Sequence, residues 1–544
     1  MQQRTDASGG IGLDAAVERV LGPGAELRPA QRDALGGLVD RDTVLVARSG
    51  AGKTAVYAIG TLVSGRATVV VSPLVALQRD QVRALGEAGV RAASVSSSVT
   101  PKQSREALEA VGTGDLDVLL LAPEQLQRDV VVEALAAADV GLVVVDEAHC
   151  VSEWGHDFRP DYLLLRPALE RLGRPRVLAM TATASPRVRE EVAERLGMVD
   201  PRVLVHDADR PNIWLGGRPA SGADERDKAV VEEVLAAEGA GIVYARTRRH
   251  VEELAERLAR EGLDALVYHA GLPDRRRSQV QDAFLGGEAD LVVATSAFGM
   301  GVDRPDVRWV VHAGPPPSLD AYYQEIGRAG RDEAPARAVV VHRPDDFGLN
   351  HYLRSGTGSR PATVRAVLAA LPAVGGEPVD REALGRGAGM SARTAARALT
   401  ALLGVGAAVA QGEGYLRGDD RSADAVLRAV REQREREHEL ELSRVELVRT
   451  YTDTLDCRRR LLLELLGEER RDPCGRCDSC DRGTSQEVTE DARVRPGQRV
   501  HHEEFGEGAV TVVEQDRVTV LFDEKGYVTL DTRLALDLGV LELV

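Results

Sequence analysis

The sequence predicts an α/β protein with two tandem domains, each built on a doubly wound parallel sheet, followed by a helical region and a small C-terminal β-barrel. The first observation is that short apolar runs alternate with amphipathic helical stretches, as expected for parallel strands joined by crossover helices. The second is that this pattern occurs twice and stops near residue 345. The apolar runs are residues 43–48, 67–73, 116–123, 140–148 and 175–183, and then 239–246, 263–270, 289–296, 307–314 and 336–343.

The composition is that of an ordinary globular protein. Of the 544 residues, 43% are hydrophobic and 28% are charged, so several domains with buried cores are expected. The formal net charge of −17 excludes a uniformly basic surface, and any phosphate contact must therefore come from local arginine patches. The sequence has neither an apolar run of roughly 20 residues nor an N-terminal signal pattern, which predicts a cytoplasmic protein without membrane contact.

Changes in composition divide the chain further. The segment "DADRPNIWLGGRPASG", residues 207–222, is expected to join the two α/β domains. The predicted boundaries are 1–208 and 209–345 for the α/β domains, 360–418 for a winged-helix-like module, 419–483 for a helical module with cysteines, 484–496 for a linker and 497–544 for the β-barrel.

The stretch "ARSGAGKTA", residues 47–55, follows the first apolar run and precedes a helical stretch. This context is typical of a phosphate-binding loop, in which backbone N–H groups face a nucleotide phosphate at a helix N-terminus. Lys53, one of four lysines in the chain, would reach the β and γ phosphates, and Thr54 would bind Mg²⁺. The alternative is an ordinary glycine turn. The candidate nucleotide-binding residues here are Ser49, Gly50, Gly52, Lys53 and Thr54.

An acidic pair, Asp146 and Glu147, begins the tetrapeptide "DEAH" at the end of the fourth apolar run. Asp146 would hold Mg²⁺ and Glu147 would act as general base on the attacking water. A carboxylate pair at a strand end is also common as a solvated chain end. The phosphate-binding loop upstream favours the catalytic interpretation, with ATP as substrate.

The second α/β domain contributes "YYQEIGRAGRDE", residues 322–333. Arg328 and Arg331 lie three residues apart and could reach one face of a helix, where they would stabilise charge on the γ phosphate, with Gln324 positioned to sense it. The alternative is an exposed pair of charges on a helix. In the functional interpretation the two domains close on ATP.

Four of the five cysteines, Cys457, Cys474, Cys477 and Cys480, lie within 24 residues. Two CxxC steps and a fourth cysteine from a neighbouring helix suit a tetrahedral Zn²⁺ site, and an iron–sulfur cluster is the main alternative. Four protein ligands leave no open position, so the site is expected to be structural. Cys150 stands apart and is expected to be a buried thiol.

These motifs together resemble the RecQ family of superfamily 2 DNA helicases, whose two α/β domains are RecA-like. The resemblance implies an ATP-dependent helicase that translocates 3′ to 5′ and unwinds duplex DNA in repair and recombination. It also implies that Arg28 and Gln31 contact adenine, although the family's aromatic residue just upstream is missing here. The matching stretches are residues 27–31, 72–82, 122–126, 146–162, 181–184, 209–213, 268–272, 293–308 and 324–332.

In this family an aromatic-rich loop follows the "DEAH" box and couples contact with single-stranded DNA to ATP hydrolysis. Here that loop would include Trp154, His156, Phe158 and Arg159. Aromatic rings stack on bases of any sequence, and an arginine can pair with phosphate. The alternative is that Trp154 and Phe158 only hold the loop against the domain.

A winged-helix-like pattern lies before the cysteines, whereas RecQ proteins usually have it after them. Helices are expected at 361–371, 380–389 and 391–404 and a β wing at 407–417, and Arg393 and Arg397 could face DNA phosphate. A purely structural module is the alternative. A charged helix is expected at 423–453.

The tail after residue 498 shows short alternating strands and resembles the Tudor or SH3-like tail of UvrD/PcrA-type helicases. This resemblance implies a docking role toward a protein partner or nucleic acid.

The predicted function is therefore ATP-dependent 3′–5′ unwinding of DNA, acting on single-stranded and on tailed or forked duplex DNA, with ATP, Mg²⁺ and Zn²⁺. Two alternatives remain open: an RNA helicase of the DEAH type, and a DNA-binding adaptor with DNA-stimulated ATPase but little unwinding.

Overall fold

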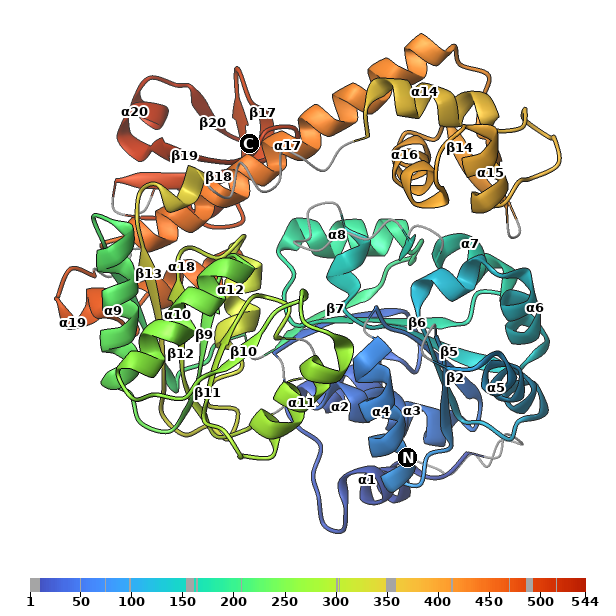
Figure 1. The fold of residues 1–544 in the computed structure, drawn as a ribbon, viewed down its shortest axis with the longest axis horizontal. Coiled ribbons are helices and arrows are strands. Elements are labelled where there is room, and N and C mark those ends of the chain that lie inside the picture. Colours follow the sequence, from blue (N-terminus) through green and yellow to red (C-terminus); the bar gives the residue numbers. More distant parts are fainter. Residues whose placement is uncertain are drawn as a thin grey trace. The chain divides into compact units, whose positions relative to one another are not determined.

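The structure is a computed structural model. It describes residues 10–544 except residues 49, 74, 97–98, 153–160, 163–164, 207, 300–301, 303, 349–358, 412–413, 469, 486–492 and 515. The chain divides into two compact units (Figure 1). One unit comprises Met1–Ala47, Ala51–His206 and Gly356–Glu437, and the other comprises Arg48–Gly50, Asp207–Ser355 and His438–Val544.

The first α/β domain contains a parallel sheet with the strand order β3-β4-β2-β5-β6-β1-β7. Its strands are β1 (Thr43–Ala47), β2 (Ala67–Val71), β3 (Ala92–Val95), β4 (Val118–Leu121), β5 (Val140–Val145), β6 (Arg176–Thr181) and β7 (Arg202–His206). Its helices are α1 (Leu13–Leu21), α2 (Pro29–Gly37), α3 (Lys53–Ser64), α4 (Val75–Glu87), α5 (Pro101–Thr113), α6 (Asp129–Ala137), α7 (Leu165–Arg171) and α8 (Pro186–Arg195), with 3-10 turns η1 (Pro123–Gln127) and η2 (Ala148–Val151).

Hydrophobic cores cover both faces of this sheet. Along β5, Val143 and Val145 belong to the core that includes α5 to α8, whereas Leu142 and Val144 belong to the core with α2, α3 and α4. Side chains alternate between the faces of a strand, so a strand buried on both faces is apolar throughout. The predicted doubly wound sheet is confirmed, and Cys150 is buried as expected, with 1% of its surface exposed.

The second α/β domain contains a parallel sheet with the order β10-β11-β9-β12-β13-β8. Its strands are β8 (Ile213–Pro219), β9 (Ala240–Ala245), β10 (Leu266–Tyr268), β11 (Leu291–Ala294), β12 (Val307–Ala313) and β13 (Ala336–His342), and its helices are α9 (Ala223–Leu235), α10 (Arg248–Arg260), α11 (Asp274–Leu285) and α12 (Leu319–Ile326). The segment 207–222 was expected only to join the domains, but it contains β8, which pairs with β13.

The helical module after the two sheets has the predicted three helices and hairpin. Its elements are α14 (Pro361–Ala370), α15 (Arg381–Gly387), α16 (Ala392–Gly404), β14 (Ala408–Gln411) and β15 (Gly414–Arg417). Helix α17 (Ala423–Asp453) follows and is as long as predicted. Its first part contributes Val426 and Val430 to the core of this module, and its last part contributes Val448 and Tyr451 to a core of the second unit.

The chain ends in a cysteine module and an antiparallel sheet. Helices α18 (Arg458–Leu465) and α19 (Asp478–Asp481) carry the cysteine module. The sheet has the order β19-β18-β17-β16-β20, formed by β16 (Arg499–His502), β17 (Gly506–Val513), β18 (Arg517–Phe522), β19 (Gly526–Asp531) and β20 (Leu541–Leu543), with α20 (Thr532–Asp537). The Val513 N–H of β17 donates to the buried Glu464 carboxylate of α18 at 3.2 Å, and burial raises the pKa of Glu464 to about 8.

Among the described residues, no helix is both long enough and apolar enough to cross a membrane.

The close contact between Gly241 and Trp309 generates a first prediction. The two residues are partners in the pairing of β9 with β12, and a Cβ added to Gly241 would lie 1.9 Å from Cε2 of the Trp309 ring. Because the tryptophan is buried, Gly241→Ala should lower the free energy of unfolding by about 1–3 kcal/mol through overpacking. Urea unfolding followed by circular dichroism measures this change.

Gly222, the N-cap of α9 in the same domain, is the matched control. A Cβ there would contact nothing within 4 Å, and serine is a good N-cap residue. Gly222→Ser should therefore change the free energy of unfolding by less than about 0.5 kcal/mol. Equal stability of Gly241→Ala and the native chain would contradict the packing seen between β9 and β12.

Candidate active site

The phosphate-binding loop lies between β1 and α3. Gly50 and Gly52 have φ angles of 81° and 75°, which are in the region that favours glycine. Helix α3 begins at Lys53, and the Lys53 Nζ donates to the Ala47 carbonyl at 2.8 Å. The turn therefore presents the N-terminus of α3 and a lysine at the carboxyl end of a parallel strand, as a phosphate site requires. Ser49 lies outside the described residues.

Gln31 ties helix α2 to this loop. Its Nε2 donates to the Gly52 carbonyl at 3.1 Å, and its Oε1 accepts from the Arg28 N–H at 3.0 Å. A Cβ on Gly52 would lie 2.4 Å from Gln31 Nε2, so this close approach also requires glycine. A carboxamide has two donor and two acceptor positions, and one of each is used here. The adenine contact of Arg28 and Gln31 stays a prediction.

Asp146 is a buried carboxylate at the end of β5, with 6% of its surface exposed. Ser72 Oγ and Gln81 Nε2 donate to its Oδ2 at 3.3 and 3.5 Å, and the Glu147 N–H donates to its Oδ1 at 3.1 Å. Burial and then the charge of Glu147 raise the pKa of Asp146 to about 6, against the opposite effect of Lys53. Residues 72–82 resemble the family, and the structure shows that two of them, Ser72 and Gln81, hydrogen-bond this carboxylate.

Glu147 has an unusual backbone conformation. Its φ of 48° is left-handed, and such strain in a residue other than glycine is concentrated at functional sites. Its Oε2 lies 3.4 Å from Nδ1 of His149, which is also 2.9 Å from Oγ1 of Thr181 at the end of β6. The "DEAH" turn is therefore fixed to the end of the neighbouring strand β6, where the "TATA" stretch begins.

The phosphate-binding loop and the acidic pair both lie at the carboxyl ends of the strands of the first sheet. The order β5-β6-β1 places the ends of these strands side by side, and ligands of open parallel sheets bind at this edge. The charge of Lys53 acts on Asp146, and Thr54 is the second residue of α3. A desolvated carboxylate near a second carboxylate and a lysine fits a nucleotide phosphate with Mg²⁺, which prefers oxygen ligands.

The aromatic loop cannot be described, because Trp154, His156, Phe158 and Arg159 lie outside the described residues. The residues on either side of it are held in the domain. Ser152 donates to Glu191 of α8. The Tyr162 hydroxyl, which is buried, donates to the Asp146 carbonyl at 3.2 Å. Ser152 and Tyr162, on either side of the loop, are thus both buried in the first domain.

In the second domain, the arginines lie in a different local structure from the one expected. Helix α12 ends at Ile326 with Gly327 as its C-cap, so Arg328 and Arg331 do not share a helix face. Arg328 is buried, at 9% exposed, and its charge opposes the rise in the pKa of Tyr244 that burial causes. The Gly330 N–H donates to the Val307 carbonyl at 2.7 Å. We call residues 327–334 the arginine loop.

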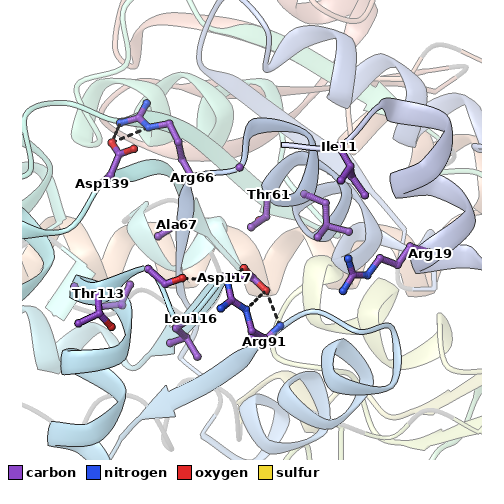
Figure 2. Close-up of a pocket in the computed structure, with 15 residues that line it drawn as sticks. Ile11, Arg19, Thr61, Arg66, Ala67, Arg91, Thr113, Leu116, Asp117 and Asp139 are labelled. Carbon is purple, nitrogen blue, oxygen red and sulfur yellow. Dashed lines mark hydrogen bonds and ion pairs between the residues drawn. The ribbon is translucent and has the colours of Figure 1, made fainter. Parts of the chain in front are cut away.

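A cavity of about 630 Å³ in the first domain is not the nucleotide site (Figure 2). It is lined by Ala67 and Asp139, next to the beginnings of β2 and β5, and therefore lies at the edge opposite Asp146. Its three arginines already have partners: Arg66 contacts Asp139 at 2.7 Å, Arg91 contacts Asp117 at 2.6 Å, and Arg19 donates to the Gly89 carbonyl.

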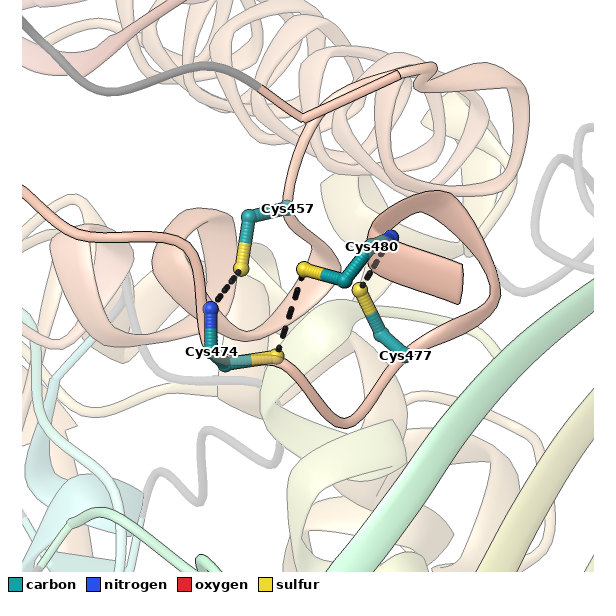
Figure 3. A group of neighbouring side chains, drawn as sticks. All are labelled: Cys457, Cys474, Cys477 and Cys480. Atoms are coloured by element: carbon teal, nitrogen blue, oxygen red, sulfur yellow. Dashed lines mark hydrogen bonds between the residues drawn. The ribbon is translucent and has the colours of Figure 1, made fainter. Parts of the chain in front are cut away.

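The four cysteines converge as predicted (Figure 3). Their sulfur atoms all lie within 4.8 Å of one another, and the sulfurs of Cys474 and Cys480 are 3.8 Å apart. A tetrahedral site with Zn–S bonds of about 2.3 Å requires sulfurs about 3.8 Å apart, so these residues fit Zn²⁺. Cys457 is the N-cap of α18, and the Cys474 N–H donates to its sulfur at 3.3 Å.

The cysteine module also extends the second sheet. Leu215 of β8 forms a parallel bridge with Cys477, and the Gly217 N–H donates to Asp478 Oδ2 at 3.1 Å. The Trp214 Nε1 donates to Asp481 at 2.8 Å. The free edge of β8 is thereby covered, which protects an edge strand from pairing elsewhere.

The arginines of the winged-helix-like module are on the surface. Arg393 and Arg397 are exposed on α16, whereas Ala395 and Leu399 face the core of the module. This placement leaves both guanidinium groups available for phosphate.

Three family models match the chain. The DEAD/DEAH box helicase model matches residues 28–192, the helicase conserved C-terminal domain model matches 225–333, and the RecQ zinc-binding model matches 418–481.

The chain is similar to the ATP-dependent DNA helicase RecQ of Pasteurella multocida, with 37% identity over 320 residues, 58% of this chain and 50% of that protein. It is also similar to the probable ATP-dependent DNA helicase RecS of Bacillus subtilis, with 38% identity over 318 residues, 58% of this chain and 64% of that protein. The chain thus spans about half the length of the first relative. The fold is like that of the Mycobacterium smegmatis helicase Lhr bound to ssDNA and AMP-PNP, with a TM-score of 0.51 and 23% identity, covering 79% of this chain and 61% of that one. Two helicase domain models and the RecQ zinc-binding model thus match this one chain, which is therefore similar to the RecQ helicases in both α/β domains and in its cysteine module.

Proposed function

We propose that this protein is an ATP-dependent DNA helicase that moves 3′ to 5′ along one strand and unwinds duplex DNA in repair or recombination. The observation that carries the proposal is that Lys53, in the loop after β1, and the buried Asp146 with Glu147, after β5, lie at the carboxyl ends of strands of one parallel sheet. The relatives named above are ATP-dependent DNA helicases, and this agreement supports DNA as the substrate.

The hydrolytic roles follow from the chemistry of each residue. Lys53 and the N–H groups at the start of α3 bind the β and γ phosphates, together with Ser49 and Gly50, which precede them in the sequence. Thr54 and Asp146 would hold Mg²⁺, which neutralises charge on the phosphates. Glu147 accepts the proton of the attacking water. Gln324, Arg328 and Arg331 of the second domain orient and stabilise the transferred phosphoryl group.

Contact with DNA would involve two regions. Trp154 and Phe158 stack on bases, and His156 and Arg159 bind nearby polar groups of the strand, so that strand contact is transmitted to Asp146 and Glu147 along the chain. Arg393 and Arg397, exposed on α16, bind duplex phosphate.

Zn²⁺ has a structural role in this proposal, because four thiolates complete its coordination. We also infer a cytoplasmic location and a docking role for the C-terminal sheet toward a protein or nucleic-acid partner. The resemblance of the tail's sequence to Tudor and SH3-like tails supports the docking role.

Strand separation is the test of the proposed function. With ATP and Mg²⁺, the protein should separate 3′-tailed and forked DNA duplexes and leave 5′-tailed DNA and matched RNA duplexes largely paired. Lys53→Ala should abolish ATP hydrolysis and unwinding because the phosphates lose their lysine, while binding of single-stranded DNA remains. Release of a fluorescent strand and production of phosphate are the two measurements.

Lys102→Ala is the matched control, since Lys102 is an exposed residue of α5 with an ion pair to Glu106 at 3.7 Å. It should unwind at the native rate. Hydrolysis that survives Lys53→Ala would contradict the phosphate-binding loop. Faster unwinding of RNA would favour the DEAH-type RNA helicase, and strong ATP turnover without strand separation would favour the adaptor.

The aromatic loop gives a separate prediction. Trp154→Ala should weaken the stimulation of ATP hydrolysis by single-stranded DNA more than the basal rate, because it removes a stacking contact of about 1–3 kcal/mol. Steady-state ATPase rates with and without an oligonucleotide measure both. An equal loss of the two rates would indicate that Trp154 only packs the loop.

A further inference from the structure

A short segment of the second domain, Ala208–Ile213, contacts both the arginine loop and the cysteine module. Its central residue is Arg210, which is buried, with 6% of its surface exposed. The Arg210 guanidinium donates to the carbonyls of Gly327, Ala329 and Gly330 at 3.0, 2.6 and 2.9 Å. These three carbonyls belong to the chain that carries Arg328 and leads to Arg331.

Asn212 holds the same loop two residues later. Its Nδ2 donates to the carbonyls of Gly330 and Ala334 at 2.8 and 2.9 Å. Gly330 has a φ of 59°, and a Cβ on it would lie 2.4 Å from that Nδ2. The arginine loop therefore follows a path that requires glycine at 330 and is fixed through its backbone from one side.

The other contacts of this segment are with the cysteine module. Asp209 accepts from Arg470 at 3.0 Å and forms an ion pair with Arg459 of α18 at 3.5 Å. The Ala208 N–H donates to Glu468 at 3.2 Å. Arg459 also donates to the Ile213 carbonyl. Residues on both sides of Arg210 are thus attached to the module that holds the four cysteines.

The chemistry of Arg210 suits positioning better than general stabilisation. Burial lowers its pKa to about 10, so the guanidinium remains charged at neutral pH. Its planar fork binds three carbonyls of one turn at once, which a lysine ammonium on a single flexible stem does not reproduce. Hydrogen bonds from a charged donor are about twice as strong as neutral ones. Three of them therefore restrict the backbone on which Arg328 and Arg331 are mounted.

We propose that Arg210 is a positioning residue for Arg328 and Arg331, and that Asp209, held by Arg459 and Arg470, anchors it to the cysteine module. The inference rests on the proposed ATP hydrolysis. It adds that the cysteine module affects the rate of hydrolysis by holding the backbone of the arginine loop.

The test compares Arg210→Ala and Arg210→Lys with the native chain in DNA-stimulated ATP hydrolysis. Arginines of this kind contribute about 10³ to 10⁵ in rate, and a displacement of about 1 Å can reduce a rate about 100-fold. We expect kcat to fall about 10- to 100-fold in Arg210→Ala with the KM for ATP changed less than about threefold. Arg210→Lys should recover only part of this loss, because it restores charge without the fork.

Arg226 provides the matched control. It is also a buried arginine of the second domain, at 9% exposed, but it pairs with Asp227 and Asp346 at 2.9 Å and not with the arginine loop. Arg226→Lys should keep the native kcat and KM. If it lost turnover to the same degree as Arg210→Lys, the effect would be general destabilisation and the positioning role would be overturned.

A structural readout separates this inference from the proposed function. In hydrogen exchange with mass spectrometry, Arg210→Ala and Asp209→Asn should both speed exchange of peptides covering residues 325–334, with the content of Zn²⁺ unchanged. Asp209→Asn keeps Arg210 in place should Arg210→Ala fail to fold. Native exchange in that loop for the folded variants would overturn the inference even if ATP is hydrolysed. A native chain without ATPase activity would overturn the proposed function and with it the catalytic part of the inference.

Discussion

The buried carboxylate of Asp146 is the constraint on which the first domain depends. A carboxylate removed from water is unfavourable unless hydrogen bonds or a cation compensate it. Here Ser72 and Gln81 donate to it, Lys53 acts on it, and the Tyr162 hydroxyl holds its main chain. The strand ends, the phosphate-binding loop and the residues beside the aromatic loop are therefore organised around one desolvated charge. A buried charge of this kind destabilises the folded domain, and a cation that binds together with a nucleotide would compensate it.

The second domain positions its candidate catalytic arginines in a different way. Its arginines lie on a loop that precedes β13, and Arg210 and Asn212 hold that loop through its main-chain carbonyls. The cysteine module covers the edge strand β8 and also fixes the segment that holds this loop. A module that looks purely structural by its metal chemistry is thereby connected to residues proposed to act on ATP. This connection is made through main-chain carbonyls of the arginine loop, and sequence motifs do not indicate such contacts.

Much of the fold could be predicted, because strands buried on two faces are apolar and helices between them are amphipathic. The edge strands β3 and β7 did not show in the apolar pattern because they are only partly buried, and β8 did not because its glycines and proline are typical of a linker. The cysteine site was predictable from spacing alone.

The expectation that Arg328 and Arg331 share a helix face was wrong. The contacts of Arg210 and Asn212 could not be predicted either, because they join segments far apart in the sequence that no local pattern connects. The described residues exclude the aromatic loop, so its contacts stay a prediction.

The measurement that tests the role of Asp146 most directly is thermal unfolding of the native chain and of Asp146→Asn, each with and without Mg²⁺ and ATP. The substitution removes the buried charge and keeps the shape of the side chain. The account predicts that, without ligand, Asp146→Asn melts at a higher temperature than the native chain. In the native chain, Mg²⁺ with ATP should raise the melting temperature more than ATP alone does, and Asp146→Asn should lose most of this difference. An unchanged Mg²⁺-dependent rise in Asp146→Asn would contradict the assignment of this carboxylate to the cation that accompanies ATP.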